Sequence, residues 1–162
     1  MHRWILASLL ALLWIGAAPA GAATVITTPS TFVRAVYERL DKGGDYIPPE
    51  DIYSPRLKAL WADEVRDAKG EVGRIDFSFW INGQDGVPKA VQIKTHAVFG
   101  HTDRQIVEVT FRNSDKPKAQ DLRFYFERLA GAWKLDDVIS VGAGEADDAW
   151  TLSTILKYGW PD

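Results

Sequence analysis

Cysteine is absent from this 162-residue sequence, and only three histidines are present. Without cysteine the chain has no thiol nucleophile, no thiolate metal site and no disulfide. His96 lies on the polar side of a predicted strand, and His101 follows in a loop beside Asp103. A metal site built from them would have to form across a flexible turn. We therefore expect solvent-exposed histidines, no metal and no cofactor.

Familiar catalytic motifs are also missing. The sequence has no Gly-x-Ser-x-Gly elbow, which positions the nucleophile in many serine hydrolases. Gly142-x-Gly144 lacks the third glycine and the strand-to-helix setting of a nucleotide-binding loop. No internal repeat, linker or low-complexity segment interrupts the chain. These absences exclude motif-defined enzyme classes and leave the function open.

The N-terminus has the pattern of an export signal. Arg3 provides a basic start, Trp4 to Ala18 is an uncharged apolar run, and the small residues Ala20 and Ala22 follow at the −3 and −1 positions. The apolar run has about fifteen residues, against roughly twenty for a membrane-spanning helix, so a retained anchor is the less favoured alternative. We predict cleavage after Ala22, with Ala20 or Ala23 as alternative positions.

Loss of residues 1–22 as a cleaved signal peptide leaves residues 23–162, which is a common length for a single domain. We expect this domain to be soluble in the periplasm, with no stable membrane insertion after cleavage. The full chain carries a net charge of −3, and removal of Arg3 makes it about −4. This acidic balance argues against nucleic acid or an anionic membrane as the partner.

The first half of the domain has a helical period. Apolar residues recur every three or four positions after Pro29, and Gly43-Gly44 would end this helix. The two prolines at Pro48-Pro49 favour an ordered connection. A second helix begins at Ser54-Pro55 and ends near Gly70, with an apolar side formed by Leu57, Leu60, Trp61 and Val65.

The second half has the period of two that strands require. The pattern predicts strands over residues 75–81, 91–99 and 107–112, a hairpin over 122–141 about Gly131, and a short helix over about 148–158. Helices followed by sequential strands predict an α+β fold. Its N-terminal helices would pack on a curved antiparallel meander sheet, enclose a cone-shaped hollow, and be joined by a short C-terminal helix.

Three ordered segments resemble a known bacterial family. They are Ser54-Pro55-Arg56-Leu57, then Ile75-Asp76-Phe77 with Gln84-Asp85 behind it, and Gly131 to Val138, which reads GAWKLDDV. In this order they resemble the exported domain-of-unknown-function 3828 family, within the nuclear-transport-factor-2-like, cystatin-like set. The chain has Asp76-Phe77-Ser78-Phe79 where the family tends to have Asp-Pro-Phe. The resemblance implies a cystatin-like fold, export and a pocket, and assigns no activity.

Carboxylates are the candidate catalytic groups. Asp137 would share a strand face with Trp133 and Leu135, and a carboxylate in an apolar pocket has a raised pKa and can act as a general base. Asp76 is the second candidate. The alternative interpretation, which we favour, is that Asp137 lies at the end of the ladder or at a bulge and accepts hydrogen bonds from the backbone or an arginine.

Aromatic side chains are abundant, and they suit both pocket walls and interfaces. For Trp61 and Trp133 we expect core packing. Trp80 would lie on the same strand side as Asp76 and Ser78, opposite the apolar face, where it could form a recognition surface. The candidate ligand- or partner-binding residues are therefore Tyr53, Asp76, Trp80, Gln84, Asp85, Tyr125 and Asp137.

Two functions from different classes fit these observations. The first is an exported binding module that holds a small molecule in the hollow of the cone or a protein on the sheet face. The second is a cofactor-free hydrolase, isomerase or dehydratase with Asp137 or Asp76 as general base. Related cone-shaped domains often pair through their sheet faces, so a homodimer is also open to this chain.

Overall fold

A computed structural model describes residues 23–44, 46–114, 118–142 and 149–160 of the chain. The predicted signal peptide over residues 1–22 lies outside this range. The elements are α1 (Pro29–Asp41), the short 3-10 helix η1 (Glu50–Ile52), α2 (Pro55–Ala68), β1 (Pro88–Val98), β2 (His101–Asn113), β3 (Ala119–Leu129), β4 (Ala132–Val141), β5 (Ala149–Thr151) and α3 (Leu152–Tyr158). None of the helices in the described part is both long and apolar enough to cross a membrane.

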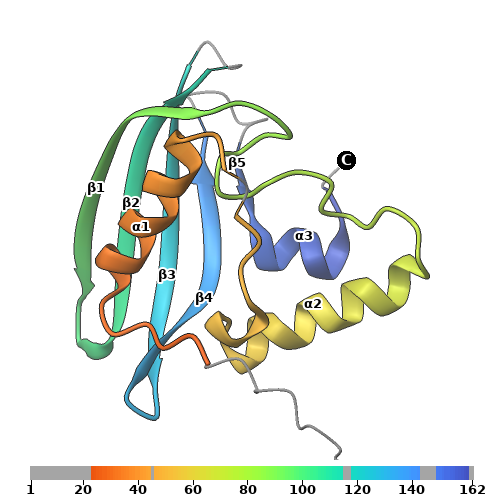
Figure 1. Cartoon of the computed structure of the whole chain (residues 1–162). Helices are drawn as coiled ribbons and strands as arrows, with labels where there is room; N and C mark the ends of the chain where they lie inside the picture. The colour runs from red at the N-terminus through yellow and green to blue at the C-terminus, as the bar shows by residue number, and fades with distance from the viewer. Residues whose placement is uncertain (1–22, 45, 115–117, 143–148, 161–162) are drawn as a thin grey trace, which may run out of the picture.

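The five strands form one antiparallel sheet in the order β1-β2-β3-β4-β5, with helices beside it (Figure 1). Each strand pairs with its neighbour in sequence, so the predicted α+β class and the meander topology are confirmed. Helix α1 crosses the sheet, while α2 and α3 lie toward the β4–β5 side (Figure 1). All three helices contribute buried side chains to a single core.

Both N-terminal helices form where the sequence predicts them. Pro29 and Pro55 occupy the first turns, where a missing N–H costs no hydrogen bond. The Ser54 hydroxyl caps α2 by accepting from the Leu57 amide at 3.1 Å. The predicted packing side of α2 is wrong at Val65, which is 71% exposed. The neighbouring Glu64 is buried in its place because Arg74 pairs with it.

The predicted strand over residues 75–81 is wrong. This segment consists of turns, with a single isolated bridge between Ser78 and Gly83. Phe79, Trp80 and Ile81 are all buried, which a strand with alternating sides does not allow when one face is solvated. Packing of three consecutive apolar side chains therefore outweighs the period of two in the sequence.

The predicted face of the strand at 133–141 is correct only as far as Leu135. Phe126 pairs with Leu135 and Tyr125 pairs with Asp137, so Asp136 is an extra residue at a bulge. The bulge reverses the alternation, because it inserts one residue into a two-residue repeat. Val138 and Ser140 consequently face the core, whereas Val141 is 42% exposed.

The C-terminal helix is shorter than predicted. Residues 149–151 form β5, which pairs with β4, and the helix begins at Leu152. The prediction also covered residue 148, which lies outside the described range.

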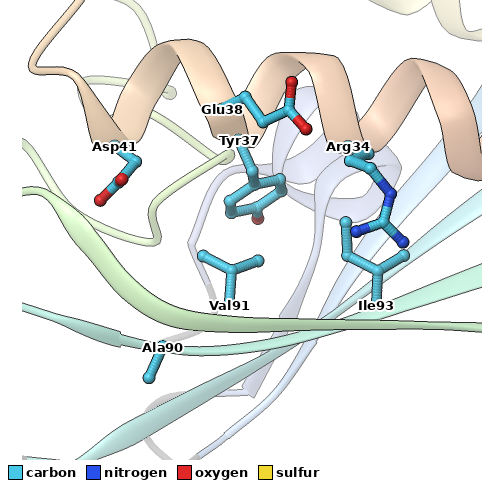
Figure 2. A pocket seen from close by; sticks show the side chains of 7 residues that line it. All are labelled: Arg34, Tyr37, Glu38, Asp41, Ala90, Val91 and Ile93. Carbon is cyan, nitrogen blue, oxygen red and sulfur yellow. The ribbon is translucent and has the colours of Figure 1, made fainter.

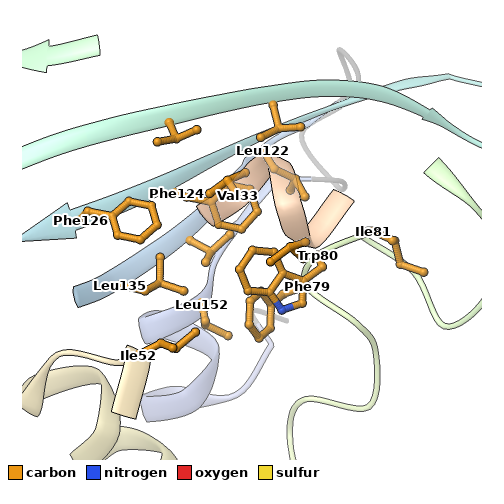
Figure 3. Close-up of a cluster of buried hydrophobic side chains, with 14 of the residues drawn as sticks. Val33, Ile52, Phe79, Trp80, Ile81, Leu122, Phe124, Phe126, Leu135 and Leu152 are labelled. Atoms are coloured by element: carbon orange, nitrogen blue, oxygen red, sulfur yellow. The ribbon is translucent and has the colours of Figure 1, made fainter. Parts of the chain in front are cut away.

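The core fills the space between the sheet and the helices (Figure 3). Phe124 of β3 lies near its centre, and the Trp80 ring stacks on it with centroids 4.8 Å apart. Leu122, Phe126 and Leu135 from the sheet face Val33 of α1 and Leu152 of α3 in the same cluster. The loop after α2 therefore contributes Phe79, Trp80 and Ile81 to the core, beside the side chains from the helices.

Candidate functional site

A pocket of about 670 Å³ opens beside the loop that carries Trp80. It contains four of the seven residues that the sequence singles out, namely Asp76, Trp80, Gln84 and Asp85. The segment 46–48, Trp61 of α2 and the loop over 75–85 form its walls. The full lining is Tyr46, Ile47, Pro48, Trp61, Ile75, Asp76, Phe77, Ser78, Phe79, Trp80, Gln84 and Asp85. Residues that are far apart in the sequence therefore come together here mainly through loops, and loops often carry binding residues.

Buried amides hold this loop in place. Asn113 Nδ2 donates to the carbonyl oxygens of Ile81 and Asp85, at 3.0 and 3.2 Å. Asn82 has a left-handed backbone with φ of 49°, its Nδ2 donates to Gln120 at 2.6 Å, and its Oδ1 accepts from the Trp150 indole at 2.8 Å. Side-chain amides supply here the hydrogen bonds that a strand ladder would supply elsewhere.

Trp80 does not form the exposed recognition surface that the sequence predicts. Its side chain is 1% exposed, and its carbonyl oxygen accepts from the Tyr37 hydroxyl at 2.5 Å. The prediction fails because it relied on strand alternation in a segment that is not a strand. The residue contacts the pocket from the core side, as part of its inner wall.

Two indole N–H groups on the pocket wall have no partner. The Nε1 atoms of Trp61 and Trp80 are both buried, and neither has a hydrogen-bond acceptor among the residues that the structure describes. An indole nitrogen can only donate a hydrogen bond, so it needs an acceptor atom on another group. Buried donors are almost always paired in native proteins, and unpaired ones require an explanation. Both side chains line one pocket, but neither Nε1 atom has solvent-accessible surface, so an acceptor from outside the chain would reach it only after the side chain moves.

Aromatic rings form the body of the pocket. Tyr46 meets Trp80 edge-on, with centroids 5.3 Å apart and planes at 84°. Phe79 lies 5.1 Å from Trp80 and 6.5 Å from Trp61. Partial burial raises the pKa of the Tyr46 hydroxyl above its ordinary value, chiefly through desolvation, so this hydroxyl stays a neutral donor.

The rim of the pocket is acidic. Asp76, Gln84 and Asp85 are exposed there, whereas the rings behind them are buried or half-buried. No lysine, arginine or histidine lines the pocket. Within the described ranges, neither the Asp76 nor the Asp85 carboxylate has a hydrogen bond or an ion pair. The two carboxylates are thus uncommitted groups at the entrance of an aromatic cavity.

The contacts of Asp137 differ from those expected of a general base. Its Oδ1 accepts from the amides of Val138 and Ser153 at 2.9 and 3.0 Å, and its Oδ2 accepts from the Ser153 hydroxyl at 2.5 Å. Arg56 lies 3.4 Å away. Ser153 is in the first turn of α3, so Asp137 accepts a hydrogen bond from one amide at the start of that helix. These contacts agree with the interpretation that we favour from the sequence, in which Asp137 accepts hydrogen bonds from the backbone or an arginine. Asp137 does not line the pocket.

The two candidate tyrosines also lie apart from the pocket lining. Tyr53 is buried, its ring is 6.3 Å from Trp61, and burial raises its pKa well above the ordinary range. It supports the pocket from behind Trp61. Tyr125 pairs with Asp137 across the β3–β4 ladder. The structure therefore brings Asp76, Trp80, Gln84 and Asp85 together and leaves Tyr53, Tyr125 and Asp137 outside.

Two of the histidines pair with acidic neighbours on β1 and β2. His96 Nε2 lies 3.1 Å from Glu108, and His101 Nδ1 lies 3.6 Å from Asp103. The part of the chain that the structure describes contains no group of three or more residues arranged to hold a metal ion.

Smaller hollows lie elsewhere. One of about 220 Å³ separates α1 from β1, where Tyr37, Val91 and Ile93 face each other beneath the charged Arg34 and Glu38 (Figure 2). Another of about 320 Å³ adjoins the main pocket and shares Tyr46, Ser78, Gln84 and Asp85 with it. The adjoining hollow extends the main site toward the end of α1.

Sequence reasoning missed Tyr46, Phe77 and Phe79 as pocket residues. The signal was present in part, since Tyr46 stands just before two prolines, which fix an extended backbone. The contact between the Tyr46 and Trp80 rings joins residues far apart in the sequence, so the apolar periodicity of the sequence does not predict it.

The chain matches no family model, no curated protein and no solved structure in the comparisons made. The function is therefore argued from the site itself.

Proposed function

We propose that this chain is a binding module that holds a small molecule in the pocket lined by Trp61, Trp80 and the loop over residues 75–85. The single observation that carries the proposal is the aromatic-lined pocket of about 670 Å³ itself, with the unpaired carboxylates of Asp76 and Asp85 at its rim. The indole N–H groups of Trp61 and Trp80 have no acceptor, an unpaired buried donor costs about 1–3 kcal/mol, and a ligand acceptor would recover that free energy if a side-chain movement exposed the donor. The volume falls within the usual range of small-molecule sites.

We also propose the finer fold and location that the sequence predicts. The domain would belong to the cone-shaped, cystatin-like class, as the resemblance to the exported domain-of-unknown-function 3828 family implies. The antiparallel meander crossed by α1 supports this assignment. The basic start and apolar run before Ala22 support export to the periplasm through a cleaved signal peptide.

Native mass spectrometry of the protein recovered from its own cells tests the binding proposal. We expect a discrete small-molecule adduct on the wild-type protein. Trp61→Phe removes one unpartnered donor and keeps an aromatic ring, so the adduct should be weakened or lost. Trp160→Phe is the matched control, because the Trp160 indole already donates to the Arg74 carbonyl oxygen and lies outside the pocket lining. An adduct-free wild type, or an adduct unchanged by Trp61→Phe, contradicts the proposal.

A cofactor-free enzyme is the second candidate, favoured by the uncommitted Asp76 carboxylate beside the cavity. Asp76 would be its general base, and Asp137 is no longer a candidate because its oxygens are occupied. If the bound molecule were identified, Asp76→Asn would abolish its turnover and preserve its binding. Turnover that survives this substitution rules the enzyme out.

A protein partner, including a second copy of the chain, would use the face of the sheet that the described helices leave open. That face carries cross-strand charges, in which Lys94 and Glu108 lie 3.6 Å apart and Arg123, which lies opposite Glu108 in the strand register, is 3.9 Å from Asp121. Because these charges already neutralise each other, we rank this surface below the pocket.

A further inference from the structure

We infer that Asp51 is the acceptor for the α-ammonium group that removal of the signal peptide creates at the start of the mature chain. The inference rests on the proposed cleavage and is independent of the pocket. Three features carry it, namely the hydrogen bond between Asp51 and residue 24, the lack of an ion pair at this carboxylate, and the anchoring of residues 24–26 on the core.

The first described residues run beside η1 and the start of β4. The Thr24 amide donates to Asp51 Oδ2 at 2.5 Å, and the Trp133 amide donates to the Ile26 carbonyl oxygen at 3.0 Å. Ile26 is 2% exposed and belongs to the core, so the course of the chain is fixed two residues after Thr24. The start of the mature chain is therefore held beside Asp51 by two backbone hydrogen bonds.

The Asp51 carboxylate has no ion pair with any residue that the structure describes. Lys134 of β4 donates to the Asp51 carbonyl oxygen, and the neighbouring Glu50 pairs with Lys58 at 3.2 Å. Asp51 Oδ1 is buried and accepts no hydrogen bond from a described residue. An exposed carboxylate such as Glu71 is solvated by water, whereas the half-buried Asp51 is partly shielded and gains more from a cation nearby.

Cleavage after Ala22 puts a positive charge beside this carboxylate. The backbone nitrogens of Ala23 and Thr24 are about 3 Å apart, and Oδ2 lies 2.5 Å from the second of them, so the new ammonium is within about 6 Å of Oδ2. Opposite charges at this separation attract, whether or not the buried Oδ1 becomes accessible. The uncleaved chain has a neutral peptide nitrogen at residue 23, so the pair exists only after cleavage.

The pKa of the α-amine in the protein from the periplasmic fraction tests the inference. Reductive methylation with ¹³C-formaldehyde keeps the positive charge and gives the amine an NMR signal that can be followed with pH. We expect the α-amine pKa of the folded protein to lie about half a pH unit or more above that of the same protein unfolded in urea. In the variant Asp51→Asn the folded and unfolded values should coincide.

Glu50→Gln is the matched control, because this carboxylate belongs to the residue next to Asp51, is exposed, and pairs with Lys58. The control should keep most of the increase in the α-amine pKa. The other titratable groups beside Asp51 are Lys134, which donates to its carbonyl oxygen, and the Tyr46 hydroxyl, whose raised pKa keeps it neutral over this pH range. Both groups are unchanged in the variant and in the control.

Equal α-amine pKa values in the folded and unfolded wild type overturn the inference, and this comparison decides the question even if Asp51→Asn does not fold. An increase that persists in Asp51→Asn overturns it as well. In both cases the proposed cleavage stands, provided that the intact mass corresponds to residues 23–162. A protein that retains residues 1–22 has no ammonium group at residue 23, so the cleavage and the inference then fail together.

Discussion

Asp137 shows at the scale of one residue why the environment of a carboxylate decides its role. The sequence places it among apolar neighbours, as a general base would be, but three hydrogen bonds to Val138 and Ser153 occupy its oxygens. A carboxylate whose oxygens already accept several hydrogen bonds has few lone pairs left to accept a proton from a substrate.

The variant Asp137→Ala should unfold more easily by about 1–3 kcal/mol, because it leaves the Ser153 amide at the start of α3 without its acceptor. Urea denaturation monitored by circular dichroism measures the change. Asp76→Ala is the matched control, and its free energy of unfolding should stay close to that of the wild type. Equal stability of Asp137→Ala and wild type would contradict the structural role.

Asp121 gives a prediction about pH. Desolvation raises the pKa of its carboxyl above the ordinary value, partly offset by Arg123, and its Oδ1 is buried without a hydrogen bond from any described residue. A raised pKa means that the native state binds the proton more tightly than the unfolded state does. The carboxyl therefore favours folding below the ordinary aspartate value of about 3.9 and loses this contribution as the pH rises through the folded value.

The substitution Asp121→Asn should accordingly stabilise the protein at pH 7 and have almost no such effect near pH 3, where the wild-type carboxyl is protonated. Thermal unfolding at the two pH values provides the measurement. A variant that is destabilised at pH 7, or shows the same gain at both pH values, would show that the burial of Asp121 carries no charge penalty.

The helices and strands show which parts of the fold the apolar period of the sequence can predict. Residues 29–41 and 122–126 follow their predicted patterns, because each has one buried face and a continuous hydrogen-bond pattern, whereas α2 forms where predicted but buries Glu64 in place of Val65. The prediction fails after the bulge at Asp136, where one extra residue reverses the faces. No local signal identifies such a bulge in a single sequence.

The strand prediction for residues 75–81 was wrong for another reason, and this error affected the prediction of part of the candidate site. Its alternation of apolar and polar residues is real, yet Asn82 and Asn113 hold it as a turn through long-range hydrogen bonds. The pocket residues Asp76, Gln84 and Asp85 were found from their motif, independently of the strand prediction. The orientation of Trp80 depended on that strand and was wrong, and the contribution of Tyr46 was missed.

Asn82 tests whether amide contacts hold the loop. Asn82→Gly preserves the left-handed backbone but deprives the Trp150 indole of its acceptor, so we expect a loss of about 1–3 kcal/mol in stability. Asn82→Ala should cost about 1–2 kcal/mol more, because alanine is strained at this φ. Chemical denaturation ranks the variants. Should Asn82→Gly match the exposed control Gln84→Gly, the amide would not be an anchor.

At the scale of the whole molecule, the predicted cleavage site lies just before the start of the described core. The described core begins with Ile26, whose carbonyl oxygen accepts from the Trp133 amide at 3.0 Å, so cleavage after Ala22 leaves every core residue in place. If the chain is exported as proposed, we expect the intact mass of the protein from the periplasmic fraction to correspond to residues 23–162. A full-length protein retained in the membrane fraction would favour the anchor instead.

The pocket beside Trp80, which we propose receives a small molecule, is the feature on which the function depends most. The most direct measurement is the indole N–H spectrum of the ¹⁵N-tryptophan-labelled protein before and after addition of a small-molecule extract from its own cells. We predict that the resonances of Trp61 and Trp80 shift as their unpartnered donors find an acceptor, while those of Trp150 and Trp160 stay in place. Unchanged Trp61 and Trp80 resonances would contradict the account.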